Sequence, residues 1–162
     1  MIVVSDSTPV HYLILVQQIE LLPRLFGRVI TPPDVMSELS QPSAPEAVRD
    51  WVRRTPQWLE VRSPKVEDSS MRLGRGERQA ICLARELGAD LVLMDDRKAR
   101  RLAESQGLAV VGTLNILKAG SDRGFLDFGD ALERLRGTSF HVSEDLLRRI
   151  VGTRRDENSE KP

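Results

Sequence analysis

The chain has 162 residues, a length that suits one domain, and its 40% hydrophobic and 30% charged residues are typical of a soluble globular protein. Basic and acidic residues balance at 24 each, so a nucleic-acid partner would need a local basic patch, and the aromatic content of 4% argues against extensive base stacking. The single cysteine, Cys82, excludes an intramolecular disulfide. No apolar run approaches the ~18 residues of a membrane span, and we expect no signal peptide before the first strand. A cytoplasmic location without membrane contact is the simplest expectation.

Strand-like and helix-like segments alternate in the first half of the chain. A short apolar run opens it, and turn residues follow most of the later apolar runs. We expect strands at 1–4, 29–30 and 58–61, helices at 9–26 (in two pieces broken near Pro23), 33–40 and 43–54, and a polar loop at 64–73.

The second half continues the same alternation. We expect helices at 76–87, 97–106, 113–119, 127–136 and 143–151, and strands at 91–94 and 108–111. This order predicts an α/β domain over residues 1–151, with a mostly parallel sheet that helices cover on both faces. Residues 152–162 are rich in charge, and we predict a disordered tail there.

Asp6 is the first candidate for a functional site. It follows the apolar run 1–4 and precedes Ser7, Thr8 and Pro9, where we expect the turn into a helix, with Ser7 or Thr8 as the cap and Pro9 at the first helical position. Open α/β sheets place their sites at the carboxyl ends of the strands. A carboxylate at this point is therefore a site candidate.

Two glutamates on predicted helices border buried faces. Glu77 shares the stripe of Ala80, Ile81 and Ala84, and Glu38 lies three residues after Val35. Each also has an ordinary interpretation: Glu77 can stabilise the start of its helix, and Glu38 can be a solvated helix residue.

Asp95 and Asp96 directly follow the apolar run 91–94. Asp96 can be the N-cap of the next helix, but two aspartates exceed what capping requires. If these carboxylates meet the others at one edge of the sheet, their repulsion favours a bound cation. A site of oxygen ligands suits Mg²⁺ or Mn²⁺ rather than zinc, and such a site can activate water against a phosphodiester.

Four blocks of the sequence resemble the PIN-domain proteins, and specifically the group similar to the toxin nucleases of prokaryotic toxin–antitoxin pairs. The matching blocks are VVSDSTPVHYL (4–13), ITPPDVMSEL (30–39), the stretch from GRGERQAICLARELGADLVLMDD to VVGTLNIL (74–117), and the helical end. The resemblance covers residues 1–151. It implies a three-layer, Rossmann-like α/β/α sandwich and a ribonuclease that uses a divalent metal.

The resemblance also implies roles for individual residues. By position, Asp6 matches the first acid of the family, Glu38 the second, and Asp96 the acid after the fourth-strand block. Glu77 stands where many relatives have aspartate, and Asp95, one position before the last acid, is a further candidate metal ligand. The chain departs from the pattern at position 94, where methionine replaces the usual threonine or serine. A small antitoxin partner and a homodimer are implied by the same analogy.

Basic and hydroxyl residues flank the predicted acids. Arg75, Arg97 and Lys98 would rim the acidic centre if both of their helices start at the same edge, which suits the phosphates of an RNA. The alternative is a solvated helix face. Ser7, Thr8 and Thr113 can contact a phosphate or a metal-bound water, although we favour capping for all three. For His11, His141 and Cys82 we expect structural roles, because none of them shows metal-ligand spacing.

The leading hypothesis is a metal-dependent endoribonuclease in which Asp6, Glu38, Glu77 and Asp96 hold Mg²⁺ or Mn²⁺ directly or through water. The second is a PIN-like module that binds nucleic acid or protein without turnover, motivated by Met94 and the low basicity. A phosphotransfer domain is disfavoured, because a haloacid-type phosphatase would have aspartate where Thr8 stands. A nucleotide site at Gly74–Gly76 lacks the preceding strand and the P-loop lysine.

Overall fold

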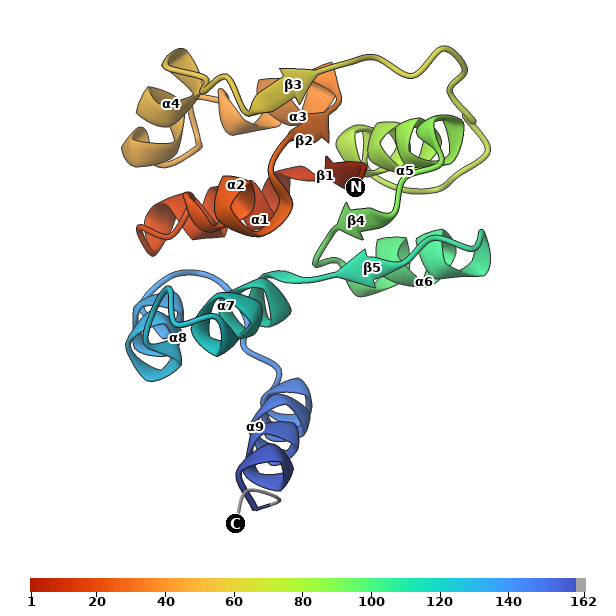
Figure 1. Ribbon diagram of the computed structural model, residues 1–162. Coiled ribbons are helices and arrows are strands. Elements are labelled where there is room, and N and C mark those ends of the chain that lie inside the picture. Colours follow the sequence, from red (N-terminus) through yellow and green to blue (C-terminus); the bar gives the residue numbers. More distant parts are fainter. Residues whose placement is uncertain (160–162) are drawn as a thin grey trace.

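A five-stranded, fully parallel sheet forms the centre of the molecule (Figure 1). The computed structural model describes the backbone of residues 1–159 and the side chains of residues 1–152. The strands lie in the order β3-β2-β1-β4-β5. Their bounds are Val3–Ser5 (β1), Val29–Thr31 (β2), Leu59–Val61 (β3), Leu91–Leu93 (β4) and Val110–Val111 (β5). The expected mostly parallel sheet is confirmed.

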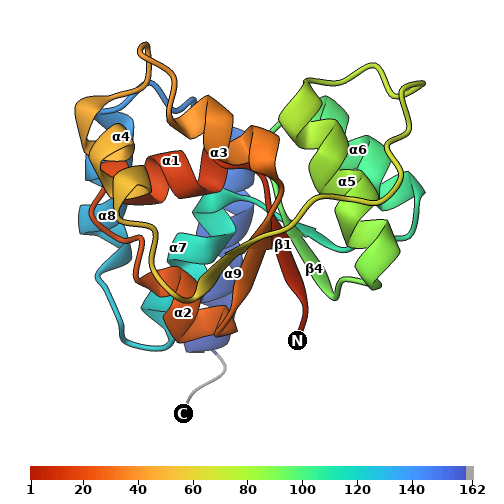
Figure 2. The same cartoon turned by 90° about the horizontal axis from the view of Figure 1, so that it is seen from above.

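Helices precede or follow each strand and cover both faces of the sheet. They are α1 (Ser7–Leu15), α2 (Leu21–Phe26), α3 (Pro33–Leu39), α4 (Glu46–Arg53), α5 (Arg75–Leu87), α6 (Arg97–Ser105), α7 (Thr113–Asp122), α8 (Phe128–Arg136) and α9 (Glu144–Ser159). Viewed from above, α5 and α6 lie on one side of the strands and α1, α7 and α9 on the other (Figure 2). The expected three-layer α/β/α sandwich is confirmed.

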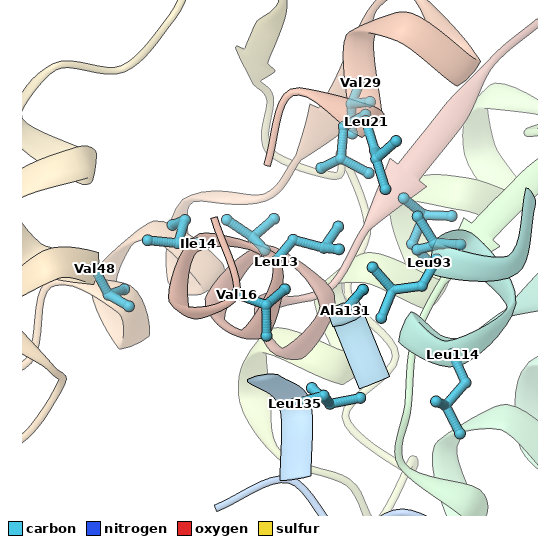
Figure 3. Packing of buried hydrophobic residues seen from close by; sticks show 14 of the residues in the cluster. Leu13, Ile14, Val16, Leu21, Val29, Val48, Leu93, Leu114, Ala131 and Leu135 are labelled. Atoms are coloured by element: carbon cyan, nitrogen blue, oxygen red, sulfur yellow. The ribbon is translucent and has the colours of Figure 1, made fainter. Parts of the chain in front are cut away.

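Successive strand residues point to opposite faces, which divides the core in two. Val29 and Leu93 pack into a large core with the helices on the α1 side (Figure 3). Val3 belongs to the same core. Their neighbours Val4 and Ile30 pack against α5 and α6 in a smaller core. A strand that is buried on both faces has a continuous run of apolar residues. These runs are the reason that the strands could be predicted from the sequence.

The topology creates a crevice between β1 and β4. From β1 the chain proceeds to β2 on one side, whereas β4 continues to β5 on the other, so the direction of winding reverses between the two strands. Ligands of open α/β sheets bind at such a switch point, outside the carboxyl ends of the strands. Asp6 follows β1 at this point and Asp95 follows β4. The backbone N–H of Asp6 donates to the Leu93 carbonyl oxygen at 2.9 Å, which continues the strand pairing into the crevice.

The expected break near Pro23 is wrong. The helices are separated by residues 16–20, and Pro23 is the third residue of α2. Proline is tolerated in a first helical turn because the N–H that it lacks would have no helical acceptor there. The break coincides instead with Gln17, which has a φ of 60°.

The last helix is longer than expected. α9 continues to Ser159, so the predicted disordered tail is helical over 152–159, while 160–162 lie outside the described residues. Gly152 lowers helix propensity but is not followed by a proline that would end the helix. The domain boundary at 151 stays a prediction. Within the described part of the chain, no helix is both long and apolar enough to cross a bilayer.

Candidate functional site

Asp6 directly follows β1 at the switch point of the sheet and is almost completely buried. Its side chain is 1% exposed, and neither carboxylate oxygen has a hydrogen-bond partner. The pKa of Asp6 is raised to about 7, chiefly by burial and in addition by the charges of Glu77, Glu38 and Asp95. The nearby N–H of Ser7 lowers this pKa, although it does not reach hydrogen-bonding geometry. A buried carboxylate without a partner is costly, and a nearby cation would stabilise its charged form.

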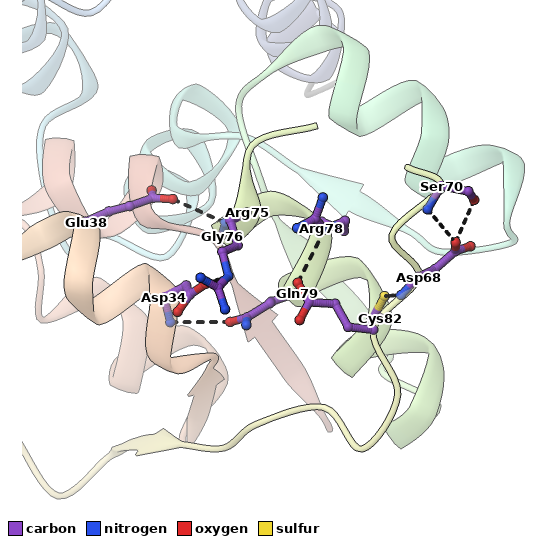
Figure 4. Close-up of polar contacts among 10 residues, drawn as sticks. Asp34, Glu38, Asp68, Ser70, Arg75, Gly76, Arg78, Gln79 and Cys82 are labelled. Carbon is purple, nitrogen blue, oxygen red and sulfur yellow. Dashed lines mark hydrogen bonds and ion pairs between the residues drawn. The ribbon is translucent and has the colours of Figure 1, made fainter. Parts of the chain in front are cut away.

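Glu38 connects the starts of two helices. Its Oε2 accepts from the Ser7 hydroxyl at 2.7 Å, and its Oε1 accepts from the Gly76 N–H at 3.2 Å (Figure 4). Gly76 is essential to this contact, because a Cβ at position 76 would lie 2.4 Å from Oε1. The predicted cap at Ser7 or Thr8 is wrong, because both residues lie inside α1. Asp6 itself occupies the N-cap of α1 without a side-chain cap bond, and Pro9 is the third helical residue.

Glu77 occupies the third position of α5 and is half-buried. Its carboxylate lies over the N-cap Gly74, as in a capping box. Burial raises the pKa of Glu77, and the charges of Asp96 and Glu38 raise it as well, while the Gly74 N–H and Lys98 lower it. The glutamate thus stabilises the helix start and also adds charge to the acidic edge.

Asp95 holds the start of α7 against the end of β4. It accepts from the Thr113 N–H at 2.8 Å and from the Thr113 hydroxyl at 2.6 Å. Burial raises the pKa of Asp95, against the opposing effects of these two hydrogen bonds and of Arg100. Thr113 is fully buried and its N–H and hydroxyl both contact Asp95. The predicted cap at Thr113 is wrong, since the N-cap of α7 is Gly112, whereas its contact with a substrate phosphate stays a prediction.

Asp96 is the N-cap of α6, as the sequence allowed. Its Oδ2 accepts from the Ala99 N–H at 2.9 Å, while the residue as a whole is exposed. The double aspartate therefore serves the starts of two different helices, with Asp95 on α7 and Asp96 on α6. Two aspartates are present because each one accepts from the N–H of a different helix start.

A cavity of about 1030 Å³ opens beside this acidic edge. Glu77, Asp95 and Asp96 line it, and Thr8 lies on the wall that α1 provides. Further lining residues are Tyr12, Arg97, Arg100, Arg101, Glu104, Gly112, Leu114, Phe140, His141, Ser143, Leu146 and Arg149. The wall thus combines carboxylates with several arginines and a few rings.

The basic residues predicted to rim the acids separate into two groups. Arg97 lines the cavity, together with Arg100 and Arg101 from the same helix. Arg75 instead pairs with Asp34 at 2.5 Å and does not line the cavity (Figure 4). Lys98 lines a separate, smaller cavity of about 350 Å³. Among the predicted phosphate-binding cations, only Arg97 thus faces the cavity.

The carboxylates at this edge offer the oxygen ligands that a divalent cation prefers, but they are not arranged as a complete metal site. Among the described residues, no three His, Cys, Asp or Glu side chains are grouped closely enough to hold a metal ion. The two orphaned oxygens of Asp6 nevertheless provide what a hard cation requires, and the neighbouring donors are also oxygens. Glu38 and Asp95 have both oxygens engaged, whereas Asp96 engages one.

Sequence reasoning missed the ring residues of the cavity. Tyr12 comes from α1, whereas Phe140 and His141 come from the connection between α8 and α9. The hydroxyl groups of Tyr12 and Ser139 are hydrogen-bonded at 2.9 Å across 127 positions of the chain. No local pattern signals a contact of that separation. The expected structural role for His141 also overlooked its exposure in the cavity.

The comparisons with known proteins agree with this architecture. The structure is similar to that of a PilT N-terminus domain protein, SSO1118, from the hyperthermophilic archaeon Sulfolobus solfataricus P2. The TM-score is 0.53 at 16% sequence identity, over 88% of this chain and 100% of that chain, a likeness that concerns the fold alone. No curated protein matches the chain. The family model DUF3368, described as a PIN domain, matches residues 2–155. The chain therefore belongs to the PIN-domain family, whose fold is of the nuclease type.

Proposed function

We propose that this protein is a divalent-metal-dependent endoribonuclease that hydrolyses RNA phosphodiester bonds. The observation that carries the proposal is Asp6, a buried carboxylate with two unpartnered oxygens at the switch point of the sheet. Membership of a family whose members are generally nucleases supports hydrolase chemistry at this edge.

Asp6, Glu77 and Asp96 are the residues we assign to the cation. Asp6 has both oxygens free, Asp96 has one, and no side-chain hydrogen bond fixes Glu77 to another element. Mg²⁺ retains several waters and requires only one or two protein carboxylates, so three acids that are not in mutual contact can hold it in part through water. When bound, such an ion supplies charge stabilisation at the phosphodiester and lowers the pKa of water.

Glu38 and Asp95 are assigned positioning roles. Glu38 ties the start of α1 to the start of α5, and so fixes Asp6 relative to Glu77. Asp95 ties β4 to α7 through Thr113. Both carboxylates also raise the pKa of Asp6, so they increase the demand for a cation in the crevice. Removal of either should weaken metal binding without abolishing it.

The arginines of α6 are assigned to the RNA backbone. Arg97 and Arg101 are exposed on the cavity wall, and Arg100 lies beside Asp95. Guanidinium groups bind phosphate oxygens in a fixed fork geometry, so they can hold a strand in register without reading its sequence. With a neutral overall charge, this local patch is the feature that can attract RNA.

We further propose a role as the toxin of a toxin–antitoxin pair, acting in the cytoplasm as a homodimer that a small antitoxin protein inhibits. This part rests on the resemblance of the sequence blocks to that group of PIN proteins. Coexpression with the product of the neighbouring reading frame tests it: the toxin hypothesis requires growth arrest by the chain alone and rescue by the neighbour.

The first experiment incubates the full chain with mixed RNA, with and without Mn²⁺ or Mg²⁺, beside Asp6→Asn and the surface control Asp50→Asn. Asp50 is exposed on α4 and pairs only with Arg53 among the described ion pairs. The proposal expects metal-dependent cleavage by the wild type and by the control, and none by Asp6→Asn. Cleavage that survives Asp6→Asn, or that ignores the metal, refutes it.

A second candidate is a PIN-like module that binds RNA or protein without turnover. The specific observation in its favour is that helix starts already engage Glu38, Asp95 and Asp96. Calorimetry with Mn²⁺ separates the candidates. Neither metal binding nor cleavage would favour the binding module, whereas metal binding that is lost in Asp6→Asn favours the nuclease.

A further inference from the structure

Ring side chains concentrate in the cavity although they are rare in the chain. The sequence has one tyrosine, four phenylalanines, two tryptophans and two histidines. Tyr12, Phe140 and His141 all line the cavity that also contains Asp96 and the arginines of α6. Three of nine such residues thus line a cavity that adjoins the acidic edge.

The rings are held in place by one another. The centroids of Tyr12 and Phe140 are 4.9 Å apart in an edge-to-face arrangement, and the ring centroid of His11 lies 4.6 Å from that of Tyr12. The Tyr12 hydroxyl is fixed by Ser139 at 2.9 Å. In an edge-to-face contact the edge of one ring meets a single face of the other. The contact between Tyr12 and Phe140 therefore leaves the remaining faces of these two rings uncovered by one another. Rigid rings of this kind lose little entropy when a ligand stacks on them.

The size and chemistry of the cavity fit more than a single phosphate group. Its volume of about 1030 Å³ lies just above the range of roughly 300–1,000 Å³ that is usual for small-ligand sites. Arg97 and Arg101 offer phosphate contacts, whereas Tyr12 and Phe140 offer apolar ring surface. A nucleotide carries both an anionic and a flat aromatic group, and this wall provides a complement for each.

We propose that Tyr12, Phe140 and His141 form a nucleobase subsite that holds one unpaired base of the RNA beside the cleavage site. The inference rests on the proposed nuclease function and adds a determinant of its sequence preference. Proteins recognise single-stranded RNA by stacking splayed bases on Phe, Tyr or His and by hydrogen bonds to the base edges. In this subsite Phe140 and Tyr12 provide the stacking surface, and the exposed His141 provides ring nitrogens for a base edge.

Binding without turnover tests the subsite directly. Fluorescently labelled RNA hexamers, both homopolymers and a series with one abasic position, are titrated with the full chain in EDTA, which prevents metal-dependent cleavage. The variants are Phe140→Leu, which retains apolar volume, and His141→Ala, which removes an exposed ring. Phe26→Leu is the matched control, because Phe26 packs on the large core but does not line the cavity. Thermal melts verify that each variant is folded.

The expected result is a ~5- to 100-fold loss of affinity for Phe140→Leu and a smaller loss for His141→Ala, with no change for Phe26→Leu. The loss must vanish on the hexamer whose contacted base is abasic, because the two changes remove the same interaction. The subsite is refuted if both variants bind like the wild type, if the loss is equal on intact and abasic RNA, or if the wild type binds no hexamer.

The cleavage assay keeps this inference separate from the proposed function. Base-dependent binding without metal-dependent cleavage by the wild type would support the subsite and refute the nuclease. Metal-dependent cleavage whose site preference is unchanged in Phe140→Leu and His141→Ala would support the nuclease and refute the subsite.

Discussion

Replacement of Asp6 by asparagine should stabilise the metal-free protein at neutral and alkaline pH. The pKa of Asp6 is raised from 3.8 to about 7 in the folded chain, chiefly by burial. Between these two values the unfolded chain ionises this group while the folded chain keeps it protonated, so stability falls as the pH rises. At 1.36 kcal/mol per pKa unit, the loss reaches about 4 kcal/mol above pH 7. An asparagine side chain cannot ionise, so the Asp6→Asn variant avoids that loss.

The assay is thermal unfolding of the wild type and Asp6→Asn between pH 4 and pH 8 in EDTA. For a domain of this size, about 4 kcal/mol corresponds to a rise in Tm of about 10 °C at pH 8. The difference should shrink toward pH 4, where the folded wild type and the folded variant are both neutral at this position. The exposed Asp50→Asn should change the free energy of unfolding by less than about 0.5 kcal/mol at every pH.

Metal should offset most of this difference. Mn²⁺ at 100 times its Kd would stabilise the wild type by about 2.7 kcal/mol and leave Asp6→Asn unchanged. Two results refute the reasoning. A difference between wild type and Asp6→Asn that is the same at pH 4 and pH 8 would show that the carboxylate is not held uncharged by burial. Equal stabilisation of both proteins by Mn²⁺ would show that Asp6 does not bind the ion.

Three further predictions concern the residues around Asp6. Gly76→Ala should displace the Glu38 carboxylate, because the new Cβ would lie 2.4 Å from its Oε1, and should weaken Mn²⁺ binding in calorimetry. Gly152→Ala is the control, because this glycine is also helical and a Cβ there would meet no atom within 4 Å. If Gly76→Ala and the wild type bound Mn²⁺ with equal affinity, the bridging role of Glu38 would be contradicted. Thr113→Val keeps the shape but removes the hydroxyl partner of the buried Asp95 carboxyl group, so chemical denaturation should show a loss of about 1–3 kcal/mol. If Thr113→Val destabilised the Asp95→Asn variant by the same amount, the lost stability would not come from the bond between Thr113 and Asp95. Arg97→Gln should reduce the affinity for every RNA sequence alike, and it should lower the slope of the logarithm of the binding constant against the logarithm of the salt concentration by about 1. A loss of affinity that depends on the RNA sequence would instead mean that Arg97 contacts a base.

The positions of the acids were predictable because strand ends are local signals. Asp6 and Asp95 each follow an apolar run that is buried on both faces, and a parallel sheet brings such ends to one edge. The partners of these acids were not predictable in the same way. Gly76 binds Glu38 across 38 positions, and Thr113 binds Asp95 across 18, so neither contact leaves a periodicity in the sequence.

The structure changes how the acidic edge is understood. Repulsion among like charges led us to expect a cation among these carboxylates, but backbone N–H groups at helix starts already stabilise most of them. Glu38, Asp95 and Asp96 each accept such a bond, from α5, α7 and α6 respectively, because helix N-termini carry partial positive charge. Asp6 is the N-cap of α1 and yet receives no cap bond on its side chain. Two of the carboxylates that helix starts satisfy, Glu38 and Asp95, also raise the pKa of Asp6, which has no such partner. This asymmetry is the reason that the proposed metal site is centred on Asp6.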